Sequence, residues 1–156
     1  MEGLFETLAE LPGNLGNIDL APDGSLLVTC REAHQVYRLR DGVDPEVIAG
    51  TGNAEGNTLS GSAALTVALE EVRGVAVLPD GSYFLATHEG GDVWWVDLEG
   101  KAHLFLQGRG GGDEQGGDGL DRTTPGDKIS EPRGLHAATN GDLLGSFGFH
   151  HNEAAR

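Results

Sequence analysis

The stretch RGVAVLPDGSYFLATHEGGDVWWV, residues 73–96, decides the fold because related versions of it occur on both sides. Residues 16–39 read GNIDLAPDGSLLVTCREAHQVYRL, and residues 133–156 read RGLHAATNGDLLGSFGFHHNEAAR. The spacing between copies is 57 and then 60 residues, measured between the turn glycines Gly24, Gly81 and Gly141. Repeats of this length indicate units that bury their apolar faces only by stacking on their neighbours.

Each copy predicts the same succession of short antiparallel strands. A Pro-Asp-Gly or Asn-Gly turn separates the first two strands of each copy, and such turns favour hairpins because Gly and Asn tolerate positive φ. First strands are expected at 18–21, 74–78 and 134–138, and second strands at 25–29, 82–87 and 142–147. Third strands are expected at 35–39 and 92–97, and fourth strands at 45–49 and 101–107. Turns at this spacing are typical of an all-β protein.

The predicted organisation is an N-terminal segment, 1–12, followed by one repeat-built segment, 13–156. Its units are expected at about 13–49, about 72–107 and, as a partial third unit, about 132–156, with Gly-rich loops at 50–71 and 108–131. Residues 62–69 within the first loop favour a helical turn or two. Trp94 and Trp95 are adjacent in a predicted strand, so we expect them on opposite faces, one of them packed between units.

The phrase Val47-Ile48-Ala49-Gly50-Thr51-Gly52, followed by VRGVAVLPDG at 72–81, resembles the NHL-repeat β-propeller family. The resemblance implies an all-β fold of propeller blades, each with four antiparallel strands. A propeller ring typically needs four to eight blades, and this chain supplies about two and a half. We therefore expect an incomplete ring. A second polypeptide, the rest of a longer protein, or self-association would complete it.

Charge and composition exclude some partners. The net charge of −15 argues against nucleic acid, which needs clustered Lys and Arg, and against an anionic membrane surface. No run reaches transmembrane length, and the acidic start of the chain is not a signal peptide. We expect a cytoplasmic protein, with export after removal of a leader as the alternative. Cys30 is the only cysteine and follows an apolar run, which favours a buried thiol.

Polar side chains gather where each second strand is predicted to end and where each first strand begins. Imidazoles and guanidinium groups in these places are candidates for acid–base chemistry or for holding an anion. The candidate catalytic residues are His88, His136, His150, His151, Arg73 and Arg133. The alternative interpretation is that the arginines brace the loops structurally and that the histidines are solvated loop residues.

A divalent ion, zinc or calcium, is the candidate cofactor, because neutral imidazole and side-chain oxygens are suitable ligands. Asp19, Ala76 and His136 occupy the same position of the repeat, where Ala is the expected packing residue. The candidate metal ligands are Asp19, Asn17, His136 and His151, with His88, His150 and Glu89 as further donors. The spacing matches no local metal motif.

Two functions follow. The leading hypothesis is an NHL-type propeller segment that binds a partner or a small ligand on its loop face, which carries the loops after the second strands and before the first strands. The alternative is a propeller hydrolase or lyase with a site near the ring axis. The resemblance implies either an esterase- or lactonase-like enzyme or an amidating-lyase-like enzyme.

Overall fold

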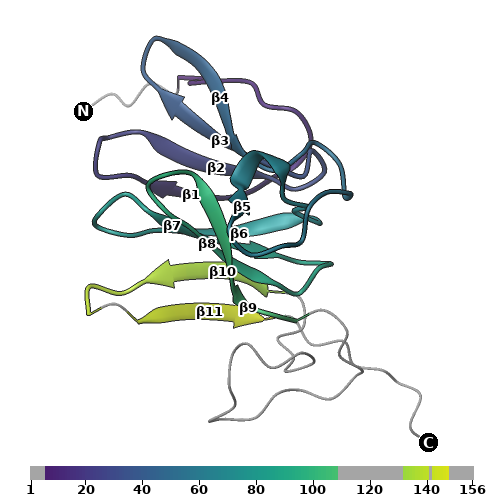
Figure 1. The fold of residues 1–156 in the computed structure, drawn as a ribbon. Helices are drawn as coiled ribbons and strands as arrows, with labels where there is room; N and C mark the ends of the chain where they lie inside the picture. The colour runs from purple at the N-terminus through teal and green to yellow at the C-terminus, as the bar shows by residue number, and fades with distance from the viewer. Residues whose placement is uncertain (1–5, 109–131, 141, 148–156) are drawn as a thin grey trace, which may run out of the picture.

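The computed structural model describes residues 6–108, 132–140 and 142–147, and these form stacked antiparallel sheets (Figure 1). The first sheet contains four strands in the order of the chain. They are β1 (Leu15–Leu20), β2 (Leu26–Cys30), β3 (Gln35–Arg40) and β4 (Val43–Ala49). The turn after β1 needs Gly24, whose φ is +83°. The first repeat therefore folds as the expected meander of four strands.

The second sheet has the same four-stranded meander and one added strand. Its strands are β6 (Val72–Val77), β7 (Tyr83–Thr87), β8 (Val93–Val96) and β9 (Lys101–Leu106). The added strand, β5 (Ser62–Ala63), pairs with β9 at the outer edge. A single turn of 3₁₀ helix, η1 (Ala64–Thr66), follows β5. The expected helical turn or two at 62–69 thus shrinks to three residues, and the expected loop 50–71 contributes a strand to the second sheet.

The third sheet contains β10 (Pro132–Ala137) and β11 (Leu143–Phe147) within the described residues. The first strands of the three sheets run side by side, with β6 in contact with both β1 and β10 (Figure 1). We call these three neighbouring first strands the inner strands. The expected loop at 108–131 and the last nine residues of the expected third unit lie outside the described part.

Two hydrophobic cores lie between the sheets. The core between the first and second sheets contains Leu27, Val36, Leu85 and Trp94, each at most 1% exposed. The core between the second and third sheets contains Phe84 and Val93, with Trp95 packed against it. The two tryptophans therefore lie on opposite faces of β8, as predicted. Cys30 is fully buried, and burial raises the pKa of its thiol.

The inner strands share one irregularity of hydrogen bonding. The pairing shifts between Val72 and Gly74 in β6, and between Pro132 and Gly134 in β10. In β1 the corresponding shift lies between Leu15 and Ile18. These are β-bulges, which bend a strand and change the direction of a side chain. The predicted first strands began after this point, so the structure extends each of them to include a bulge.

No helix in the described residues is both long and apolar enough to cross a membrane.

Candidate functional site

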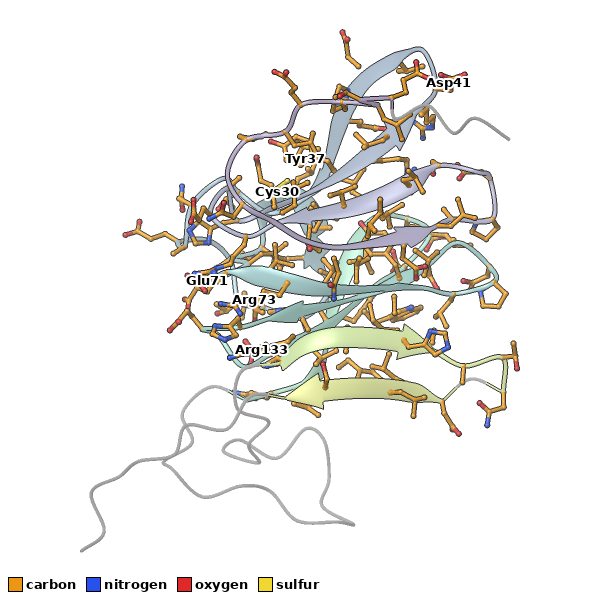
Figure 2. The ribbon with its side chains drawn as sticks, turned by 180° about the vertical axis from the view of Figure 1, so that it is seen from behind. Cys30, Tyr37, Asp41, Glu71, Arg73 and Arg133 are labelled. Carbon is orange, nitrogen blue, oxygen red and sulfur yellow. The ribbon has the colours of Figure 1, made fainter. Side chains whose placement is uncertain are left out.

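The bulges in β6 and β10 are occupied by arginine. Arg73 is the unpaired residue between Val72 and Gly74, and Arg133 is its equivalent in β10. Glu71, Arg73 and Arg133 lie one after another along the same edge of the stacked sheets (Figure 2). Arg133 is exposed, whereas the Arg73 side chain is 20% exposed. The fold thus places two guanidinium groups of equivalent repeat position on neighbouring inner strands.

Glu71 is the centre of an ion-pair cluster at this edge. Arg31 Nε donates to Glu71 Oε2 at 3.0 Å, and Arg31 Nη2 donates to Oε1 at 3.1 Å. Arg73 Nη2 adds a bond to Oε2 at 3.3 Å. The hydrogen bond from Arg31, with a further one from Arg73, lowers the pKa of the Glu71 carboxyl despite its burial. Glu71 is therefore a stable anion at neutral pH.

The backbone of Glu71 is also unusual. Its φ is +49°, in the left-handed region that costs a non-glycine residue about 1–3 kcal/mol unless its surroundings hold it there. Two histidines provide that support. The Glu71 amide donates to His34 Nδ1 at 3.1 Å, and the Glu71 carbonyl accepts from the His88 amide at 3.1 Å. His34 Nδ1 also lies 3.2 Å from the Leu69 carbonyl oxygen, so the imidazole contacts the backbone at two points before β6.

His88 packs directly against this cluster. Its side chain is 7% exposed, and Nδ1 lies 3.4 Å from Glu71 Oε2 and 3.5 Å from Glu89 Oε1. Glu89 extends outward and is 64% exposed. A buried imidazole next to two carboxylates can act as a base or hold a proton close to an incoming ligand.

Glu71, His88 and Glu89 also bring their donor atoms within 4.8 Å of one another. Within the described residues this is the only such group of three His, Cys, Asp or Glu side chains. Its donors suit zinc or a similar ion. Both oxygens of Glu71, however, already accept hydrogen bonds from Arg31, and Arg73 adds a second positive charge. An ion would therefore have to compete with two guanidinium groups for this carboxylate.

Asp19 and Asn17 make contacts between strands. Asp19 Oδ2 accepts from the Val77 amide at 2.7 Å, which joins β1 to β6. Asn17 Nδ2 donates to the Arg133 carbonyl at 3.0 Å, which joins β1 to β10. His136 is exposed on β10, and within the described part neither it nor Asp19 belongs to a metal-type group of three. His150 and His151 lie outside the described residues.

Of the predicted site residues, the structure thus brings Arg73, His88 and Glu89 together. Glu71, Arg31 and His34 are not among the site residues predicted from the sequence. Glu71 stood at the end of a segment interpreted as a loop, and its contacts cross from one repeat to another. The signal available in the sequence was indirect. Arg31 directly follows β2, and His88 directly follows the equivalent strand β7. A carboxylate just before β6 therefore lies between these two side chains.

Comparison with known proteins supports the fold. No family model matches the chain, and no curated protein matches it. Among solved structures, the chain is similar to a protein of unknown function from Bacteroides thetaiotaomicron, with TM-score 0.70, 17% identity and 89% of this chain covered. An auxiliary nutrient binding protein from the same organism gives TM-score 0.65, 14% identity and 90% coverage. Virginiamycin B lyase from Staphylococcus aureus gives a TM-score of 0.56 and 13% identity, with 88% of this chain covered.

The chain spans about a third of the length of these structures, covering 35% or 36% of each. At such low sequence identity, the structural similarity supports only the fold. The matched proteins are β-propellers, and the stacked four-stranded sheets described above are arranged in the same way. The three sheets are therefore blades of a β-propeller: two complete blades and, within the described residues, two strands of a third.

Proposed function

We propose that this chain is a segment of an NHL-type β-propeller that binds a small anionic ligand on its loop face. The loop face is the edge that carries Arg31, Glu71, Arg73, His88 and Arg133. The expected ligand bears a carboxylate or phosphate group. The remaining blades come from another polypeptide or from further sequence of a longer protein.

The observation that carries this proposal is the pair of bulge arginines. Bulges are frequent beside functional sites because they redirect a side chain. Here equivalent bulges present Arg73 and Arg133 on two neighbouring inner strands. Arg73 Nε is buried and has no hydrogen-bond partner within the described residues. A guanidinium offers paired donors that match a carboxylate or phosphate, which makes these positions suited to an anion.

Completion of the ring rests on the free face of the first blade. On β1, Ile18 is 59% exposed and Leu20 is 63% exposed, whereas Ala21 and Leu27 face the second blade and are buried. Exposed apolar side chains on one face of a propeller blade form a surface against which another blade can pack. The greater length of the similar structures supports the same interpretation.

Titration calorimetry with citrate and with inorganic phosphate tests the proposed ligand class on the purified full chain together with any polypeptide that copurifies. We expect saturable binding that weakens with added salt, since the charges are partly exposed. Arg133→Gln should weaken it by about tenfold, the loss of roughly one charge-assisted hydrogen bond. The matched control is Arg40→Gln, at the opposite end of the first blade and paired with Glu46.

Two outcomes would count against the proposal. The first is the absence of saturable binding for both probes. The second is an equal loss in Arg133→Gln and Arg40→Gln, which would mean that only overall charge matters.

A hydrolase or lyase is the second candidate, and the position of His88 favours it. A buried imidazole beside Glu71 and Glu89 has the arrangement of a general base with a carboxylate next to it. A metal at Glu71, His88 and Glu89, or at Asp19, Asn17, His136 and His151, belongs to this candidate. Metal analysis of the purified protein before and after chelation separates the two: a stoichiometric ion whose removal abolishes turnover favours the enzyme, and its absence favours the metal-free binder.

A further inference from the structure

A cleft of about 610 Å³ lies between the first and second blades at the end opposite to the loop face. It is bounded by the two Pro-Asp-Gly turns, which follow β1 and β6, and by the turn between β8 and β9. Arg73 lies at the start of β6, whereas Asp80 lies in the turn after the end of that strand. The cleft is therefore separate from the arginine and histidine cluster and plays no part in the proposed function.

Arg38 lines this cleft, and its positive charge acts on the Asp23 carboxylate of the same cleft. Arg38 is half-buried, its Nε is buried without a hydrogen-bond partner, and its guanidinium makes no ion pair within the described residues. The nearby Glu46 pairs instead with Arg40, at 2.9 Å. A buried N–H donor with no acceptor is costly, so a ligand oxygen beside Arg38 Nε would be stabilising.

The repeat shows that Arg38 replaces a packing residue. Arg38 is paired with Leu27 across the first blade, and Trp95 is paired with Phe84 at the equivalent place in the second. Trp95 packs against the core between the second and third blades. The first blade thus has a charged side chain where the second has an aromatic one, and this charged side chain lines the cleft between the first two blades.

The cleft also presents carboxylates with free oxygens. In each Pro-Asp-Gly turn, Oδ1 accepts from the following serine, Asp23 from Ser25 and Asp80 from Ser82. Within the described residues, Oδ2 of Asp23 and of Asp80 accepts no hydrogen bond. The serine hydrogen bonds lower the pKa of both carboxyl groups, so both are charged at neutral pH. Each has an open position for a positively charged donor.

Three further acidic residues line the cleft: Glu46 pairs with Arg40, Asp97 accepts from His103, and Glu99 is exposed. The other walls are apolar or neutral. Ile48 and the exposed Leu65 contribute aliphatic surface, and Tyr83 closes the inner wall. The Tyr83 hydroxyl makes only a long contact of 3.5 Å with the Ile48 carbonyl, and burial raises the pKa of this hydroxyl, which keeps it protonated. It is therefore a second donor available beside Arg38.

We propose that this cleft binds a small zwitterion, an amino acid with an aliphatic side chain, whose carboxylate lies on Arg38 and whose ammonium group lies on the Pro-Asp-Gly carboxylates. A simple anion would be repelled by Asp23 and Asp80, and a simple cation would leave the buried Nε of Arg38 without an acceptor. Only a ligand with both charges satisfies both sides of the cleft. Ile48 and Leu65 would contact its aliphatic part.

NMR titration of the isotope-labelled full chain tests this with three probes of similar shape. L-leucine carries both charges, 4-methylpentanoate lacks the ammonium group, and 3-methylbutylamine lacks the carboxylate. We expect saturable shifts for leucine at residues of the cleft, and binding weaker by about tenfold or more for each analogue. Arg38→Gln should remove the difference between leucine and the amine, whereas Arg40→Gln, two residues along the same strand, should bind leucine normally.

Several results would overturn the proposal. They are no saturable shift with leucine at millimolar concentration, amine binding as tight as leucine binding, and unchanged leucine binding in Arg38→Gln. If Arg38→Gln fails to fold, Asp80→Asn replaces it, because the amide oxygen preserves the turn and only the charge is lost. Unchanged leucine binding in that variant would equally contradict the proposal.

Discussion

Arg31 and Glu71 meet at two points: Arg31 Nε is 3.0 Å from Glu71 Oε2, and Arg31 Nη2 is 3.1 Å from Oε1. The two residues belong to different repeats, Arg31 following β2 and Glu71 preceding β6. The pair therefore joins the loop faces of the first and second blades. It also orients the carboxylate against which His88 packs. The same contact thus stabilises the blade boundary and shapes the candidate site.

Replacement of Glu71 should make the protein less sensitive to acid. The bond from Arg31 lowers the pKa of Glu71 in the folded protein, so its contribution to stability is complete above the unfolded pKa and is lost as pH falls through the folded one. We expect Glu71→Gln to lose about 1 kcal/mol of unfolding free energy at pH 7, and the gap from wild type to narrow between about pH 5 and pH 3. Urea unfolding across that range measures it.

Glu55→Gln is the matched control for this prediction, because Glu55 is exposed and its side chain makes no ion pair in the described residues. It should follow wild type at every pH. A constant gap between wild type and Glu71→Gln from pH 7 to pH 3 would show that the carboxylate charge does not contribute.

The repeated hairpins were predictable because their information is local. The Pro-Asp-Gly turns fix where β1 and β6 end, and the structure places both hairpins there. The opposite faces of Trp94 and Trp95 follow from strand alternation alone. Strand β5 was not predicted, since its two residues carry no alternating pattern and pair with β9 across a distance of about forty residues in sequence.

The candidate site was only partly predictable for a related reason. Arg73 and His88 stood out because they occupy the ends of repeated strands. Glu71 did not, because its role depends on a positive φ and on contacts with Arg31 in another repeat. Asp19 was selected from the sequence because the second repeat has Ala76 at the same position. Its hydrogen bond to the Val77 amide, however, can be seen only when the packing of β1 against β6 is known.

Asp19 gives a test that separates a structural role from metal binding. Its Oδ2 accepts the Val77 amide at 2.7 Å, so Asp19→Ala should leave that donor without its partner and cost about 1–2 kcal/mol of unfolding free energy. Asp19→Asn keeps an acceptor oxygen and should cost less. Thermal and urea unfolding of both variants measure the difference. Equal losses in the two variants, together with the loss of a bound ion, would instead assign Asp19 to a metal site.

Thr29 should be required for its hydroxyl rather than its volume. The side chain is fully buried, and Oγ1 accepts from the Asn17 amide at 2.8 Å and lies 2.8 Å from the Arg73 carbonyl, to which it donates. It therefore links the bulges of the first and second blades. Thr29→Val keeps the shape and leaves both backbone groups unpaired, which should cost about 2–3 kcal/mol. Chemical unfolding measures this loss. Thr29→Ser keeps the hydroxyl and should lose about 1 kcal/mol, mainly for the methyl group.

A similar loss in Thr29→Val and Thr29→Ser would contradict this assignment, because both variants would then be responding only to altered packing.

The exposed face of the first blade yields a prediction about assembly. Ile18 and Leu20 are 59% and 63% exposed on β1, on the side that faces away from the second blade. If another blade covers them, the double substitution Ile18→Asp and Leu20→Asp buries two charges in that contact and should abolish it. Light scattering with native mass spectrometry should show a complex for wild type and a single chain for the variant. Leu59→Asp, at a similarly exposed leucine in the connecting segment, should retain the complex.

A wild-type protein that is monomeric and melts cooperatively would mean that these blades are stable without a completed ring, and that Ile18 and Leu20 face solvent.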